Sequence, residues 1–86
     1  MKITDVRIRK RMGDEKLKAF ASVTFDDCFV VHDIKIIQAE RGLIVAMPSR
    51  RSSDGTYRDI VHPINREMRE QLQTAILDRY RAEAEG

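Results

Sequence analysis

The chain has 86 residues, of which 42% are hydrophobic and 35% charged, a balance typical of a soluble globular protein and not of a disordered one. A chain of this length forms one domain with a modest core, so we expect a single domain over residues 1–86 and consider oligomerisation a natural way to bury more apolar surface. No run approaches the roughly 20 apolar residues of a membrane-spanning helix, and we expect no membrane insertion.

The net charge of +2 is small, but the charge is distributed unevenly along the chain. Residues 1–20 hold seven Lys or Arg against three acids, residues 21–46 are net acidic, and basic charge returns over residues 47–63. Such an asymmetry matters for the binding of polyanions.

Cys28 is the only cysteine, which excludes an intrachain disulfide and fits a reducing compartment. The basic residues at the start are not followed by an apolar run, so the pattern is not that of a signal peptide. We therefore expect a cytoplasmic protein.

The first residues predict a strand that continues into a hairpin. Residues 6–9 alternate apolar and basic side chains, as a strand with one buried face does, so Arg7 and Arg9 share its other face. Ile3 has the opposite parity, which predicts a bulge or separate packing. Gly13 is expected to supply the positive φ of the following turn.

A second, longer strand is predicted over residues 17–25, where apolar side chains alternate with Lys18, Phe20 and two hydroxyl residues. A turn at residues 26–27 and a short third strand at 29–31 complete an antiparallel meander.

Two interpretations exist for residues 32–41. Isoleucines at helical spacing, a possible cap at Asp33 and the position of Gly42 favour a short helix. A continued strand is the alternative, because Ile34 and Ile36 also alternate. We favour the helix.

Residues 42–65 predict a second hairpin. An apolar strand at Leu43–Met47 precedes turn chemistry at residues 52–55, and a strand at Tyr57–Val61 is stopped by Pro63.

This second hairpin would carry Arg50 and Arg51 at one end of its loop and Arg58 beyond the other end. Three guanidinium groups opposed only by Asp54 and Asp59 would form a docking surface for phosphate.

A final amphipathic helix is the clearest element. Asn65 is a favourable N-cap, Leu77 points away from the apolar stripe, and residues 82–86 are expected to fray. The stripe has the helical spacing of one buried face and consists of Met68, Leu72, Ala75 and Ile76, extended by Tyr80. The elements together predict an α+β fold with an antiparallel sheet in the order βββ-α-ββ-α.

Catalytic, cofactor and metal sites are not expected. His32 and His62 have neither ligands nor a nucleophile at suitable spacing, and each is interpreted as capping an element or bonding a backbone carbonyl. Cys28 lacks the basic surroundings that activate a thiolate. We expect no enzyme and no small-molecule substrate.

Few aromatic side chains are available for stacking on bases. Phe20 and Tyr57 are the candidates, and no helix-turn-helix, zinc-finger or ribonucleoprotein motif is present. Contacts with nucleic acid would therefore be mostly to phosphates.

Four linked blocks carry a family resemblance. The opening MKITDVRIRK, then FVVHDIKII, GLIVAMPSRR and DGTYRDIVHPIN follow in the order and spacing of the stage V sporulation protein G (SpoVG) family. The resemblance runs from Met1 to about Tyr80. It implies a bacterial protein tied to septation, sporulation and regulation through nucleic-acid binding, and it places basic residues at Arg50 and Arg51.

The resulting expectation is a homodimeric regulator that binds DNA or RNA and influences septation or developmental gene expression. The expected nucleic-acid-binding residues are Arg50, Arg51, Arg58, Arg66, Arg69, Arg7 and Arg9. The alternative is a protein-interaction module in cell division that acts without nucleic acid, through apolar residues such as Leu77 or Phe20.

Overall fold

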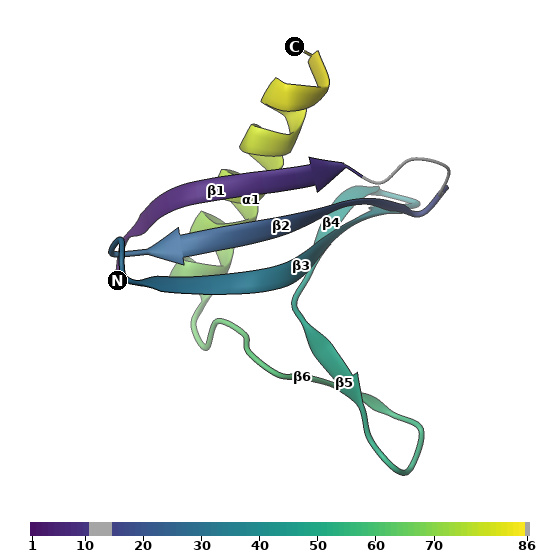
Figure 1. Ribbon diagram of the computed structural model, residues 1–86. Coiled ribbons are helices and arrows are strands. Elements are labelled where there is room, and N and C mark those ends of the chain that lie inside the picture. The colour runs from purple at the N-terminus through teal and green to yellow at the C-terminus, as the bar shows by residue number, and fades with distance from the viewer. Residues whose placement is uncertain (11–14, 86) are drawn as a thin grey trace.

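The computed structural model describes residues 1–10 and 15–85, so the turn predicted at Gly13 lies outside the described residues. The main sheet is antiparallel in the order β1-β2-β3-β4, formed by β1 (Ile3–Lys10), β2 (Leu17–Phe25), β3 (Phe29–Ala39) and β4 (Gly42–Ala46). A separate two-stranded sheet pairs β5 (Ser49–Arg51) with β6 (Tyr57–Asp59), and α1 (Arg66–Glu85) follows. The small hairpin projects away from the main sheet, and α1 lies along one face of that sheet (Figure 1).

The core lies between α1 and the main sheet. Strict alternation in β2 places its odd-numbered residues 19–25 on the buried face, as the sequence predicted. The buried residues are Val6, Ala19, Ala21, Val23, Phe25, Val31, Ile34, Ile36, Leu72 and Ile76.

A bulge near the start of β1 explains the parity of Ile3. Ile3 is opposite Phe25, yet Asp5 is already opposite Thr24, so one extra residue is accommodated on β1. The bulge lets Ile3 pack against the core, in agreement with the sequence-based expectation.

The short helix predicted for residues 32–41 is wrong, because β3 continues to Ala39 as a strand. The helix was predicted from isoleucines whose spacing fits a helix as well as a strand. Ala21 is opposite Ile34, whereas Val23 is opposite Val31, so β3 contains a bulge at residues 32–33. The bulge changes the parity of the strand, which allows both Val31 and Ile34 to be buried.

Asp33 and Gly42 have structural roles other than helix caps. Asp33 adopts a φ of 62° within the bulge, a left-handed conformation that Asp tolerates better than most residues. Gly42 has a φ of 128° and pairs with Ala39 across the two-residue turn that joins β3 to β4. Positive φ is thus required at a bulge and a hairpin, not at a helix terminus.

The hairpin predicted from two strands at 43–47 and 57–61 is also wrong in its pairing. β4 pairs with β3, and Tyr57–Asp59 pairs with the new strand β5. Pro48 separates β4 from β5, because proline has no N–H to donate to a sheet. Its carbonyl instead accepts a hydrogen bond from Ile60 N at 2.8 Å, which closes the stem of the small hairpin.

The final helix has the predicted cap and stripe. Met68 N donates to Asn65 Oδ1 at 2.8 Å, and Leu72 and Ile76 are buried. Leu77 was predicted to point away from the core, but it is partly buried against it. The α+β class and the amphipathic helix are confirmed, with six strands preceding a single helix within the described ranges. Among these residues, no helix is long and apolar enough to span a membrane.

Candidate nucleic-acid interface

The small hairpin presents three arginines on a short two-stranded ribbon, residues 49–59, hereafter the arginine hairpin. Arg50 is directly opposite Arg58, and Arg51 is opposite Tyr57. All residues of both strands are exposed. Because cross-strand neighbours share a face and their Cβ atoms lie about 5 Å apart, Arg50 and Arg58 bring two positive charges together.

This juxtaposition disfavours the isolated hairpin, since like charges placed directly opposite one another repel. A bound phosphate would relieve the repulsion and accept hydrogen bonds from both guanidinium groups. Arg51 lies on the other face of the ribbon, where its Nη2 atom would be 3.9 Å from a Cβ placed at Gly55 in the turn.

The turn of the arginine hairpin is fixed by a hydrogen-bond network around Asp54. Asp54 Oδ1 accepts from Thr56 Oγ1 at 2.7 Å, Ser52 Oγ at 2.7 Å and Thr56 N at 3.1 Å. Hydrogen bonds from the Thr56 and Ser52 hydroxyls and from the Thr56 amide lower the pKa of Asp54 to about 2. The carboxylate is therefore committed to the turn, and Gly55 supplies a φ of 88° next to it.

The start of α1 contributes one arginine near this hairpin. Arg69 lines an open hollow of about 400 Å³ together with Ser49, Tyr57 and Asp59 of the hairpin. Arg66 is exposed but forms an ion pair with Glu70, with 2.9 Å between Nε and Oε1. The structure thus brings Arg69 beside the hairpin stem and pairs Arg66 with Glu70 on the helix surface.

Arg7 and Arg9 belong to a different surface. They lie on the face of the main sheet opposite α1, and the hollow they line contains no residue of the arginine hairpin. The expected set of basic residues therefore divides into two groups, one on the hairpin and helix start and one on the sheet.

The two histidines take up local hydrogen bonds. His62 Nδ1 lies 3.0 Å from the carbonyl oxygen of Pro63, the kind of backbone contact that the sequence predicted. His32 Nδ1 instead lies 2.9 Å from Ser22 Oγ, so the prediction of a cap or carbonyl partner is wrong for His32. The part of the chain that the structure describes has no group of three His, Cys, Asp or Glu side chains suited to a metal.

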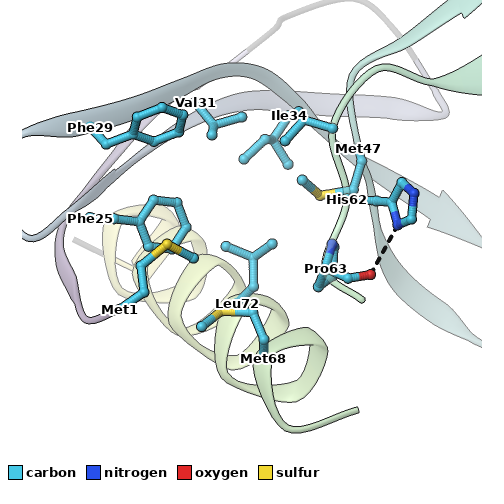
Figure 2. A pocket seen from close by; sticks show the side chains of 11 residues that line it. Met1, Phe25, Phe29, Val31, Ile34, Met47, His62, Pro63, Met68 and Leu72 are labelled. Atoms are coloured by element: carbon cyan, nitrogen blue, oxygen red, sulfur yellow. Dashed lines mark hydrogen bonds between the residues drawn. The ribbon is translucent and has the colours of Figure 1, made fainter. Parts of the chain in front are cut away.

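A small apolar hollow of about 80 Å³ lies between the β2–β3 turn, the segment after β6 and the start of α1. Figure 2 shows Phe25, Leu72 and Met68 around it, with His62 at its edge hydrogen-bonded to Pro63. Its walls are hydrophobic apart from His62, whose Nδ1 atom is hydrogen-bonded to the Pro63 carbonyl, so the hollow has little polar surface with which to orient a substrate. The segments before and after the arginine hairpin contribute Met47 and Val61 to its wall, and no residue of the hairpin itself lines it.

Comparison with known proteins places the chain in a family. The SpoVG family model matches residues 1–82. The chain belongs to the SpoVG family. A SpoVG relative from Clostridium perfringens is 61% identical over 80 residues, which cover 93% of this chain and 89% of the relative. Relatives from Acetivibrio thermocellus and Caldicellulosiruptor saccharolyticus are 59% and 56% identical, over 100% and 95% of this chain and 92% and 93% of their own lengths. All three carry the name "Putative septation protein SpoVG".

The sequence analysis missed two residues, one in the turn of the arginine hairpin and one on the main sheet. Thr56 completes the turn network, and the signal was its place two residues after Asp54, where a hydroxyl and an amide reach the same carboxylate. Lys35 was missed because its segment was interpreted as a helix. As a strand residue between buried Ile34 and Ile36, it points to the exposed side of the sheet.

Proposed function

We propose that this SpoVG-family chain is a small regulator that binds DNA or RNA and influences septation, sporulation or developmental gene expression. The septation names of its relatives support the process, and the pairing of Arg50 with Arg58 on an exposed, projecting hairpin supports the mode of binding. It acts by binding in the cytoplasm, without catalysis, cofactor, membrane insertion or small-molecule substrate.

The arginine hairpin is suited to phosphate contacts. Arg50, Arg51 and Arg58 are exposed, and the nearest turn carboxylate, Asp54, is occupied by its own hydrogen bonds. Arg69 extends the basic surface towards α1. Contacts of this kind position a nucleic acid without reading its sequence.

The working unit is a homodimer in this proposal. β4 is an edge strand of the main sheet, and Ile44 within its apolar run is 48% exposed. An unpaired edge readily pairs with a second chain, and a two-fold symmetric pair would present two arginine hairpins. The second hairpin would bind at high effective concentration once the first is engaged.

Replacing Arg50 and Arg51 together by Ala tests the proposal. We expect weaker binding to many sequences, a fall in the duplex salt slope of about two units, and a nearly unchanged melting temperature, because both side chains are exposed. Fluorescence anisotropy over a salt series measures this.

The matched control is Arg79→Ala with Arg81→Ala, which removes the same charge from the far end of α1. The control should bind nearly as the parent does. Equal losses in the two double variants would indicate a general charge effect and would reject the hairpin as the site.

A protein-interaction role is the second candidate, favoured by exposed apolar residues on the segment that follows β6. Ile60 and Ile64 are 68% and 88% exposed. Binding through such residues should respond little to salt, whereas binding to phosphate weakens steeply as salt rises. This candidate would be favoured if protein partners stay bound to this chain at high salt while the chain binds no nucleic acid at low salt.

A further inference from the structure

The main sheet has one face that α1 does not cover. Arg7, Arg9, Lys18, Phe20, His32 and Lys35 occupy this open sheet face, since each is next to at least one strand residue that is buried or partly buried on the side of the helix. Figure 1 shows α1 on one side of the main sheet and the arginine hairpin extending away from it.

An aromatic ring lies in the middle of this face between two cations. Arg9, Phe20 and Lys35 occupy directly opposite positions on three adjacent strands. The Arg9 guanidinium carbon is 5.3 Å from the centre of the Phe20 ring, within the range of a cation–π contact. Phe20 is only partly buried, although the opposite face of its own strand has a core that takes up apolar side chains.

The charge of the open sheet face is mainly positive. Asp5 pairs with Arg7 at 3.1 Å, and Asp33 lines the same hollow as Phe20. No carboxylate of the described residues forms an ion pair with Arg9, Lys18 or Lys35. Three cations of this face are therefore available to an anionic ligand, and Arg9 is the one that contacts the Phe20 ring.

Polar atoms accompany the ring. Ser22 Oγ and His32 Nδ1 are 2.9 Å apart, and both residues line a hollow of about 350 Å³ with Arg7, Arg9 and Phe20. A hydroxyl, an imidazole and two guanidinium groups offer donors for the edge of a base or for a sugar.

We propose that the open sheet face binds single-stranded nucleic acid, with one base stacked on Phe20 and the flanking phosphates held by Arg9, Lys18 and Lys35. A flat ring between cations matches a ligand that alternates flat bases with phosphates. A duplex keeps its bases stacked inside the helix and cannot offer one to the ring. The inference rests on the proposed function and adds a second site, distinct from the arginine hairpin. This site would bind single strands in preference to duplex.

The test compares Phe20→Leu with the parent chain. The probes are 12-nucleotide oligothymidylate, 12-nucleotide oligouridylate and a 12-base-pair DNA duplex, followed by fluorescence anisotropy at one salt concentration. Affinity for the single strands should fall by at least about fivefold, as loss of a base stack does, and affinity for duplex should stay unchanged. The two single strands together cover the DNA and RNA forms of the ligand.

Two further variants separate stacking from folding. Phe29→Leu is the matched control, because Phe29 is 59% exposed and lies opposite Phe25, five residues along β2 from Phe20. It should bind single strands as the parent does, and Phe20→Tyr should retain the affinity because it keeps the ring. Should Phe20→Leu prove unstable, shifts of the Phe20 ring resonances in the parent on addition of oligothymidylate give the same answer.

Unchanged single-strand binding in Phe20→Leu, or equal losses for single strand and duplex, would overturn the inference. If the parent binds duplex through Arg50 and Arg51 but gains nothing from the Phe20 ring, the proposed function stands and the open sheet face is not a site. If the parent binds none of the three probes, the proposed function itself fails.

Discussion

Asp54 organises the tip of the arginine hairpin although it is exposed to solvent. Three hydrogen bonds from Thr56 and Ser52 converge on its Oδ1 atom. They stabilise the ionised form over the protonated form and so lower the pKa of Asp54 to about 2. The turn thereby supports the strand register in which Arg50 is opposite Arg58.

The contribution of Asp54 to the turn should depend on pH in a defined direction. Because the folded pKa of about 2 is below the ordinary value of 3.8, the stabilisation is fully present above pH 3.8 and is lost as the pH falls through about 2. We expect an NMR titration of the Asp54 carboxyl carbon to give a midpoint near 2.

Thr56→Val provides the control for this titration. It removes the hydroxyl that contributes most to the shift, so the pKa of Asp54 should move back towards 3.8. A parent midpoint at the ordinary value, or no response to Thr56→Val, would show that the turn network does not form in solution.

At the scale of elements, two interruptions of regular strand structure determine the path of the chain. The bulge at residues 32–33 keeps Val31 and Ile34 on one face, and Pro48 lies between the last strand of the main sheet and the first strand of the small one. Each break redirects the chain without exposing the core. The second break sets the arginine hairpin apart from the main sheet.

The helix depends on its cap at Asn65. Asn65→Ala removes the acceptor of Met68 N and should reduce the free energy of unfolding by about 1 kcal/mol. For a domain of this size, such a loss lowers the melting temperature by roughly 4–8 °C. Thermal denaturation followed by circular dichroism measures the shift.

Asn65→Ser is the matched variant for the cap, because serine also accepts a hydrogen bond at this position. It should melt close to the parent. A melting temperature of Asn65→Ala equal to that of Asn65→Ser would mean that the hydrogen bond to Met68 does not stabilise the helix.

At the scale of the whole molecule, one chain leaves apolar surface uncovered. α1 covers one face of the main sheet, β4 forms one of its two edges, and Ile44 remains 48% exposed. A small domain gains most from association because its own core is thin. The proposed dimer would close this edge.

Light scattering at low micromolar concentration tests the dimer. We expect a mass about twice the 10.0 kDa of one chain, and a mass near 10.0 kDa for Ile44→Lys, since a charge on an edge strand opposes pairing with another chain. Thr74→Lys, on the exposed face of α1, is the control and should remain dimeric. If the parent has a mass near 10.0 kDa and still binds nucleic acid fully, the working unit is not a dimer.

The sequence alone was sufficient for β2, the cap at Asn65 and the helix stripe. In each case the signal is local, because alternation, a cap and a 3.6-residue period are properties of consecutive residues. Family membership was predicted from four linked blocks and was confirmed over residues 1–82.

Pairing and faces were decided by the tertiary structure. The strand at 32–39 became clear only through its pairing with Leu17–Phe25 and Gly42–Ala46, since isoleucines at residues 34, 36 and 37 satisfy both periods. Arg50 is opposite Arg58 because the chain starts a new strand after Pro48. Lys35 is opposite Phe20 because β3 pairs with β2. Such contacts depend on register between distant segments, and register is fixed only when the whole sheet buries one face against the helix.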